Sequence, residues 1–198
     1  ELTRSGIVEG MAVQAEFMQE IEERSKELSH RIEKLRRMDY QEREKLCLSR
    51  CNSQQYLVKV AEKYRPLALQ NHLSLIVRGD SFPLYLDQEK MTLALENLVM
   101  NSIRYTASGG TITLEAHRQG KWAEILVTDT GEGMDIAYLN KIFSRGYTGE
   151  RTHSGLGLYI ASEVVRAHHG TISVQSAPHQ GSIFTLQIPN QEKENTQY

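Results

Sequence analysis

Apolar positions recur every three or four residues between residues 11 and 45, a stretch without glycine or proline. The seam consists of Met18, Ile21, Ser25, Leu28, Ile32 and Leu35. This spacing predicts a long helix with one narrow apolar stripe on an otherwise charged surface. Because such a stripe needs a partner to be buried, we expect a second helix against it, contributed by another copy of the chain. Packing against the rest of its own chain is the alternative.

From residue 46 onward the pattern changes to short apolar or alternating runs separated by turn residues. Strands are predicted at residues 73–77, 84–86, 111–117, 122–127, 171–175 and 182–188. Helices are predicted around 57–69, from 88 onward, at 136–141 and at 156–169. Helices combined with a mixed sheet of about five strands predict an α+β fold, a two-layer α/β sandwich.

Local signals mark several helix ends. Asp87 stands where an N-cap belongs, and Gly170 is predicted as the C′ residue that stops the last long helix. Pro66 is expected near the middle or the start of the helix over residues 57–69. The helix that follows Asp87 should turn one face inward, formed by Met91, Ala94, Leu95, Leu98 and Ser102. Residues 191–198 read as a polar tail.

Composition narrows the possible functions. The 198 residues carry a formal net charge of −2, which gives no reason to expect nucleic acid as a partner. No apolar run approaches the roughly 18 residues of a membrane span, and no signal peptide opens the sequence, so we expect no membrane contact by these residues. Cys47 and Cys51 lack a second pair of ligands, which favours idle thiols over zinc or a disulfide framework and fits a cytosolic setting.

An acidic turn is the first candidate site. Asp129 follows an apolar strand and is followed by the alternating glycines Gly131 and Gly133. A carboxylate at that point can accept a hydrogen bond from an exocyclic amine, so it suits a planar base better than a phosphate. The glycines permit a sharp turn or a close approach to a ligand. On its own this pattern is weak, because it also occurs in ordinary strand-to-helix turns.

A ridge of polar side chains follows one helix. Asn97, Asn101 and Tyr105 are spaced four residues apart, and Arg104 falls beside the two asparagines. An amide oxygen can take one place on an octahedral magnesium ion that otherwise keeps phosphate oxygens and water. Two amides and a guanidinium therefore suit a magnesium-bound triphosphate.

The segment between Met134 and Gly155 is the predicted lid over such a ligand. It contains two glycines and two arginines, which favour mobility and a grip on phosphate oxygens; a solvated loop is the alternative. The residues concerned are Arg145, Gly146, Gly149, Arg151 and His153. Gly155 and Gly157 precede a helix beginning near Leu158, whose first amides would attract phosphate.

Taken in order, these motifs resemble the ATP-binding domain of sensor histidine kinases, within the GHKL superfamily that also holds gyrase, mismatch-repair and chaperone ATPases. The resemblance covers roughly residues 50 to 190. Its motifs are an N box (95–106), a G1 box (129–134), an F box (142–146), a G2 box (155–158) and a closing strand (181–189). The chain departs from the pattern at His153, where the family often has glycine, and its lid is short.

The resemblance implies ATP and Mg²⁺ as cofactors, with Asn101 as the metal ligand and Arg104 on the phosphates as the second catalytic residue. The nucleotide-binding set that it implies is Asn97, Asn101, Arg104, Tyr105, Asp129, Gly131, Gly133, Met134, Arg145, Gly155, Leu156, Gly157 and Leu158. It further implies that residues 1–46 are part of a dimerisation and phosphoacceptor hairpin, that residues 47–190 are the catalytic domain, and that a homodimer and a response regulator are the partners.

One position bears on the type of reaction. The water-hydrolysing relatives carry a glutamate one turn before the metal-binding asparagine, whereas this chain has Asn97 there. A neutral amide cannot take a proton from water, and Glu96 points about 100° away around the helix. The sequence therefore favours phosphoryl transfer over hydrolysis.

A phosphoacceptor histidine is not evident. His30 is followed by Arg31 and lies only 71 residues before Asn101, too close for the rest of a hairpin. We therefore expect the acceptor upstream of residue 1, in a larger and membrane-bound receptor whose cytoplasmic part includes this chain. The alternatives are a degenerate kinase acting as a nucleotide-gated interaction module, and a GHKL ATPase.

Overall fold

The computed structural model describes residues 46–147 and 156–191. From Leu46 onward the chain forms one compact unit. The predicted seam helix, most of the predicted segment 1–46 and nearly all of the predicted tail lie outside the described residues, so the division of the chain at residues 46 and 190 stays a prediction. No helix in the described part of the chain combines the length and apolar composition needed to cross a bilayer.

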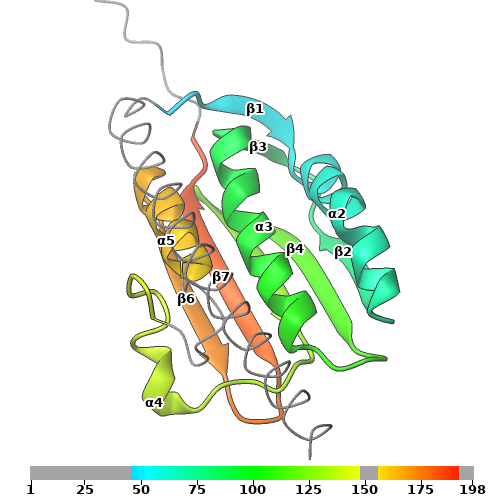
Figure 1. Ribbon diagram of the computed structural model, residues 1–198. Helices are drawn as coiled ribbons and strands as arrows, with labels where there is room; N and C mark the ends of the chain where they lie inside the picture. Colours follow the sequence, from blue (N-terminus) through cyan, green and yellow to red (C-terminus); the bar gives the residue numbers. More distant parts are fainter. Residues whose placement is uncertain (1–45, 148–155, 192–198) are drawn as a thin grey trace, which may run out of the picture. The chain divides into compact units, whose positions relative to one another are not determined.

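A five-stranded mixed sheet forms one layer of the domain, in the order β2-β4-β5-β7-β6 (Figure 1). The strands are β2 (Ser74–Gly79), β4 (Thr111–Gln119), β5 (Trp122–Asp129), β6 (Thr171–Ser176) and β7 (Ser182–Pro189). β2 pairs with β4 in parallel, and the other neighbours are antiparallel. The predicted mixed sheet of about five strands is confirmed.

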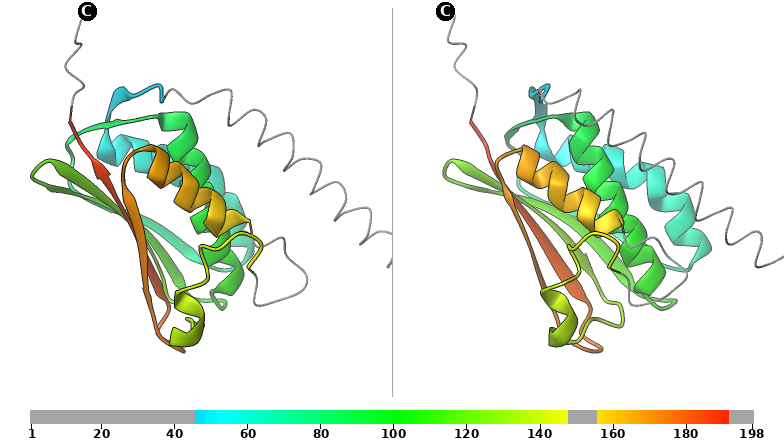
Figure 2. Two further views of the ribbon diagram at one scale, coloured as in Figure 1. Left: turned by 90° about the vertical axis from the view of Figure 1, so that its left-hand side faces the viewer. Right: turned by 60° about the vertical axis from the view of Figure 1, so that its left-hand side comes forward.

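Three helices form the second layer and cover one face of the sheet (Figure 2). They are α2 (Ser53–Gln70), α3 (Gln88–Tyr105) and α5 (Gly157–Ala167), and a short helix, α4 (Ile136–Leu139), lies outside this layer. Along β5 and β7 every second residue is buried, because side chains alternate between the helix-covered face and the open face. The predicted two-layer α/β sandwich is confirmed.

Helix α3 matches its predicted pattern closely. Asp87 is the N-cap, and its side chain accepts a hydrogen bond from the Lys90 amide. The five residues expected on the inward face are all fully or almost fully buried. Since both signals lie within the helix itself, α3 is placed correctly by local sequence alone.

A separate two-stranded sheet was not predicted. β1 (Ser49–Asn52) pairs antiparallel with β3 (Pro83–Leu86), outside the five-stranded sheet. The strand expected at residues 84–86 therefore exists but belongs to this small sheet. β1 has no apolar alternation, so its pairing with a distant segment leaves no local signal.

Two expected helix details are wrong. Pro66 lies within the last two turns of α2, rather than near its middle or start. At the end of α5 the left-handed C′ position is taken by His169, with φ of 58°, and not by Gly170. The His169 amide donates to the Arg166 carbonyl and the Gly170 amide to the Val165 carbonyl, which is a Schellman motif. Gly170 is required for another reason, because a Cβ there would overlap the carbonyl oxygen of Gln187.

Both described ends of the domain are bonded to residues 83–87. The Cys47 amide donates to Asp87 Oδ2 at 3.0 Å. The Asp87 amide in turn donates to His168 Nε2 at 3.0 Å, which links α3 to the end of α5. Asn190 caps the other end by accepting from the Tyr85 amide and donating to the Pro83 carbonyl. The chain therefore enters and leaves the described domain at one corner.

Candidate functional site

A buried carboxylate lies at the end of β5. Asp129 is the last residue of the strand, on its helix-covered side, and is only 4% exposed. Its Oδ1 accepts hydrogen bonds from the amides of Gly131 (3.0 Å) and Ser182 (3.1 Å). Its Oδ2 accepts one from the Ser102 hydroxyl of α3, at 3.1 Å. Three elements of the fold thus converge on one side chain.

The electrostatics of Asp129 leave it able to bind a further donor. Burial raises the pKa of this carboxyl, and the three hydrogen bonds oppose the rise by favouring the ionised form. An ionised carboxylate offers about four acceptor sites, of which three are used. The fourth, on Oδ2, can accept an N–H from a ligand, as the sequence predicts for an exocyclic amine.

The two glycines after Asp129 are explained by contacts within the protein. A Cβ on Gly131 would lie 2.5 Å from the carbonyl oxygen of Tyr105 at the end of α3. Gly133 has φ of 68°, and a Cβ there would overlap the carbonyl oxygen of Ala177 in the β6–β7 turn. The expected close approach is therefore to the chain's own backbone. No contact of either glycine with a ligand is needed to account for it.

Backbone hydrogen bonds fasten this turn on both sides. The Glu132 amide donates to the Tyr105 carbonyl at 3.0 Å, and the His179 amide donates to the Glu132 carbonyl at 2.6 Å. The Met134 amide donates to Ser176 Oγ at 2.9 Å. Residues 130–134 are therefore held between the end of α3 and the β6–β7 hairpin.

The polar ridge on α3 faces the start of α5. Asn97 Nδ2 donates to the Leu93 carbonyl, and its Oδ1 lies 3.0 Å from where a Cβ on Gly157 would be. Asn101 follows one turn later and is partly exposed, and its side chain has no hydrogen-bond partner among the described residues. The backbone of Tyr105 contacts the acidic turn. The structure thus places Asn97 against the start of α5, while Ser102 and Tyr105 near the C-terminal end of α3 contact the acidic turn.

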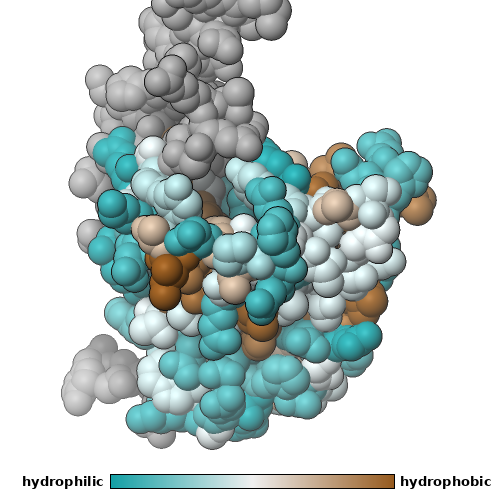
Figure 3. Space-filling view, turned by 90° about the horizontal axis from the view of Figure 1, so that it is seen from below, coloured by the Kyte–Doolittle hydropathy of each residue, from teal (hydrophilic) through white to brown (hydrophobic). Residues whose placement is uncertain are grey.

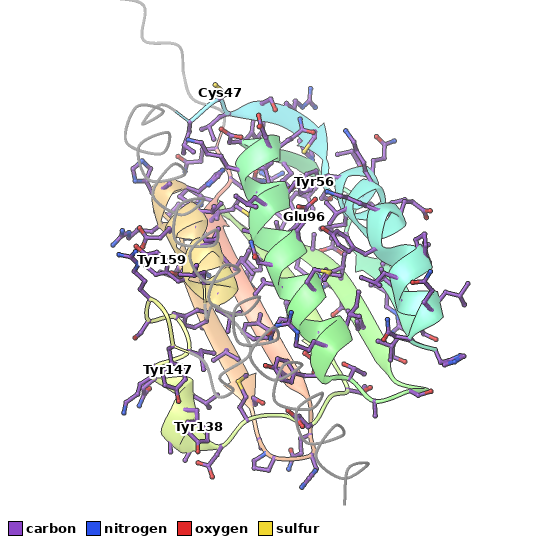
Figure 4. All side chains as sticks on the ribbon, viewed as in Figure 1. Cys47, Tyr56, Glu96, Tyr138, Tyr147 and Tyr159 are labelled. Carbon is purple, nitrogen blue, oxygen red and sulfur yellow. The ribbon has the colours of Figure 1, made fainter. Side chains whose placement is uncertain are left out.

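Glu96 points to the other side of α3. It forms an ion pair with Lys63 of α2, and Figure 4 shows it on the side of the helix that faces α2 and Tyr56. The expected direction of Glu96, away from the Asn97 ridge, is therefore confirmed.

A cleft of about 810 Å³ opens at the C-terminal end of α3. Its lining residues are Arg104, Tyr105, Thr106, Ala107, Thr130, Gly131, Glu132 and His179. Figure 3 views the domain from this end and shows a largely hydrophilic surface with separate apolar patches. The cleft unites Arg104, Tyr105 and Gly131 of the predicted set. Asn97 and Asn101 lie further along α3.

The donor set fits a magnesium ion that keeps most of its ligands from phosphate and water. In the described ranges no three His, Cys, Asp or Glu side chains cluster as a metal site. Asn101 offers one unengaged amide oxygen on a partly exposed helix face. One protein oxygen beside a triphosphate is a pattern that Mg²⁺ accepts, since it dehydrates reluctantly.

The root of the predicted lid is anchored to the core. Ile142 is buried, and Phe143 packs edge-on against Phe184 of β7, with ring centroids 6.4 Å apart. Tyr147 also packs against the core cluster. Arg145 lies on the exposed side of this segment. The rest of the lid lies outside the described residues, namely Gly149, Arg151, His153 and Gly155.

The start of α5 is the remaining predicted part. The helix begins at Gly157, within one residue of its expected start at Leu156 to Leu158, and Leu156 precedes it without a side-chain cap. Leu158 and Met134, which flank the lid in sequence, are half-buried and pack against the core cluster. The first amides of α5 therefore have no side-chain acceptor from the N-cap residue.

Sequence reasoning missed two residues that contact Asp129. Ser102 was expected on the inward face of α3 but without a role, and Ser182 was read only as the start of a strand. A lone serine on an apolar helix face was the available signal for Ser102. No sequence signal was available for Ser182, because it donates through its backbone amide. Its pairing with Asp129 depends on the register of β5 and β7.

Comparison with known proteins gives a consistent assignment. A family model described as histidine kinase-, DNA gyrase B-, and HSP90-like ATPase matches residues 86–192. The alginate biosynthesis sensor protein KinB of Pseudomonas aeruginosa is 33% identical over 150 residues, which cover 74% of this chain and 25% of KinB.

Two solved structures are similar in fold. Full-length ShkA, in complex with AMPPNP, has a TM-score of 0.69 at 25% identity and covers 74% of this chain and 32% of its own. Histidine kinase ThkA, in complex with the response regulator protein TrrA, has a TM-score of 0.68 at 21% identity and covers 86% of this chain and 50% of its own. The chain thus spans a quarter of KinB and about a third of ShkA.

Proposed function

Because the chain belongs to the family of histidine kinase-, DNA gyrase B- and HSP90-like ATPases and contains its catalytic ATP-binding domain, we propose that it is the catalytic region of a sensor histidine kinase. In this proposal it binds ATP with Mg²⁺ and passes the γ-phosphoryl group to a histidine that precedes residue 1. The bond between the γ-phosphorus and the β,γ-bridging oxygen breaks, a phosphorus–nitrogen bond to the imidazole forms, and ADP leaves.

The observation that carries the proposal is the environment of Asp129. Its remaining acceptor site, beside three fixed donors, supports recognition of the adenine amine by a charge-assisted hydrogen bond. Gly131, Gly133 and Met134 hold this turn in place. In this proposal Leu156, Gly157 and Leu158 would border the nucleotide, and the first amides of α5 would attract its phosphates.

The phosphates are assigned to the α3 ridge and to the lid. Asn101 would hold Mg²⁺, which supplies charge neutralisation on the phosphate oxygens. Arg104 and Arg145 would contact those oxygens directly, while Asn97 and Tyr105 border the nucleotide. Gly155 belongs to the same set by its position before α5.

The residues near the proposed metal position favour phosphoryl transfer over hydrolysis of ATP. Asn97 Nδ2 donates to the Leu93 carbonyl, its Oδ1 lies beside Gly157, and an amide is no base. Glu96, the nearest carboxylate in sequence, is engaged by Lys63 on the side of α3 that faces α2. A water molecule at the γ-phosphate would therefore lack a proton acceptor on α3.

The whole protein's partners extend the proposal. The ThkA structure is that of a histidine kinase with a response regulator, and this similarity supports a response regulator as the partner that receives the phosphoryl group. The apolar seam between residues 18 and 35 supports a homodimer. KinB is named a sensor protein, and this similarity supports a sensory role for the larger protein, in whose cytoplasmic part we place this chain.

A nucleotide and labelling experiment tests the proposal. The chain is titrated with ATP and Mg²⁺ by calorimetry, alongside Asp129→Asn. It is then incubated with γ-labelled ATP, alone and with a separate hairpin protein carrying an acceptor histidine. We expect ATP binding that Asp129→Asn weakens about tenfold or more, only trace self-labelling, and acid-labile, base-stable label on the added hairpin.

The contrary outcomes are distinct. Rapid release of free phosphate would identify an ATPase. ATP binding without label on any added hairpin would favour the nucleotide-gated interaction module. Acid-labile label on His30 would place the acceptor inside this chain and refute its expected position upstream.

A further inference from the structure

Ser102 is a buried side chain that contacts the functional carboxylate from a different layer of the fold. It lies on α3, is 0% exposed, and its hydroxyl donates to Asp129 Oδ2 at 3.1 Å. The other two donors to Asp129 are backbone amides and go to Oδ1. Ser102 is therefore the one side chain among the described residues that donates a hydrogen bond to this carboxylate.

The division of donors determines which oxygen meets a ligand. Oδ1 has both lone pairs occupied by the amides of Gly131 and Ser182. Oδ2 has one lone pair occupied by Ser102 and one remaining. A ligand N–H must therefore approach Oδ2, beside the Ser102 hydroxyl. Since an ionised carboxylate has no hydrogen to give, that hydroxyl must donate to Oδ2.

We propose that Ser102 is a positioning residue that keeps Asp129 an ionised, fixed acceptor, and that it thereby makes the site select 6-amino over 6-oxo purine nucleotides. The inference rests on the proposed role of Asp129 in base recognition. With Ser102 donating to it, the ionised Oδ2 can only accept from a ligand. An exocyclic amine satisfies Oδ2, whereas a carbonyl at the same position of the base would face it with a second acceptor.

The ionisation of Asp129 depends strongly on Ser102, because few groups favour the charged form of this carboxyl. Burial raises the pKa of the carboxyl, and Ser102 is one of only three groups that lower it; no charged side chain contributes. Removing the hydroxyl therefore moves the carboxyl toward its protonated form. A protonated Asp129 has an O–H to donate, so it would accept a 6-oxo base that the ionised form rejects.

The test compares Ser102→Ala with the parent chain and with Ser53→Ala. Ser53 is an equally buried serine whose hydroxyl bonds to the Asp80 carbonyl, far from Asp129, so it controls for loss of a buried hydrogen bond. ATP and inosine triphosphate, which differ at the 6-position, are titrated by calorimetry from about pH 5 to 8. The carboxyl ¹³C resonance of Asp129 is titrated without nucleotide and assigned with Asp129→Asn.

In Ser102→Ala we expect a higher titration midpoint for Asp129 and a preference for ATP over inosine triphosphate reduced about tenfold, most strongly at acidic pH. Ser53→Ala should change neither. If Ser102→Ala does not fold, Ser102→Cys, with its weaker donor, should give smaller changes in the same direction.

Two results would contradict the reasoning at different levels. An unchanged Asp129 titration in the folded Ser102 variant would overturn the inference, whatever the nucleotide affinities are. Equal affinity of the parent chain for ATP and inosine triphosphate, together with the expected shift in titration, would overturn the base-recognition role of Asp129 while upholding the control that Ser102 exerts on it.

Discussion

Replacing Gly133 by alanine should damage the site far more than the same change at Gly120. Both glycines have left-handed backbones, with φ of 68° and 61°. They differ in their surroundings. A Cβ on Gly120, in the β4–β5 turn, meets nothing within 4 Å, whereas a Cβ on Gly133 would overlap the Ala177 carbonyl, well inside the 3.0 Å that real Cβ contacts keep. Comparing Gly120→Ala with Gly133→Ala therefore separates the energetic cost of backbone strain from that of a steric clash.

The magnitudes follow from these two terms. A left-handed conformation costs an L-residue about 1–2 kcal/mol, and this should be the whole cost at Gly120. At Gly133 the β6–β7 turn must also move away. That movement would break the hydrogen bonds that join His179 to Glu132 and Met134 to Ser176. At about 1 kcal/mol for each bond, we expect Gly133→Ala to cost about 3–4 kcal/mol.

Urea unfolding of the full chain, followed by far-UV circular dichroism, measures the difference in free energy of unfolding. ATP affinity is measured on the same samples below the unfolding transition. Gly120→Ala should bind ATP like the parent, and Gly133→Ala should bind it poorly. Equal destabilisation by the two variants, within about 0.5 kcal/mol, would refute the view that Gly133 is fixed by the hairpin backbone.

Two further predictions concern the metal position and the corner of the domain. Asn101→Ala should reduce Mg²⁺-dependent ATP affinity while leaving metal-free ADP binding nearly unchanged, as measured by calorimetry; a parallel loss of both would mean that Asn101 only supports α3. Burial lowers the pKa of His168 below its ordinary 6.5, so the unfolded chain binds a proton that the folded chain resists, and stability should fall as pH drops below about 6.5. His168→Gln, whose side-chain oxygen can still accept from the Asp87 amide, should lose less stability between about pH 7 and 5, and an unchanged acid slope in urea unfolding would exclude His168 as the cause.

Features that depend on neighbouring residues were predictable from the sequence. The N-cap at Asp87 and the inward face of α3 follow from a capping preference and a helical period, and both are confirmed. The strand ends fall within about two residues of their expected positions. The order of the motifs along the chain was also sufficient to identify the family.

Features that depend on distant contacts were not predictable. β1 is polar and becomes a strand only by pairing with β3. Sequence preference favoured Gly170 for the left-handed end of α5, but contact with Gln187 fixes that glycine for a different purpose, and His169 takes the strained position. Likewise, the sequence places Ser102 on the inward face of α3, but its partnership with Asp129 depends on how α3 lies over β5.

The single corner at which the chain enters and leaves the domain has a mechanical consequence. Cys47, Asp87 and Asn190 fasten both chain ends to residues 83–87, and α3 begins at the same place with its inward face buried in the core. A turn of the chain at this corner would therefore rotate the domain as one body, α3 included. Asn101 lies 14 residues after Asp87, or about 21 Å at the rise of an α-helix. A rotation of about 10° about the corner would carry it through about 4 Å, more than the length of a hydrogen bond. If Asn101 holds the metal and phosphates as proposed, such a rotation would be sufficient to bring a phosphate into or out of reach of an acceptor.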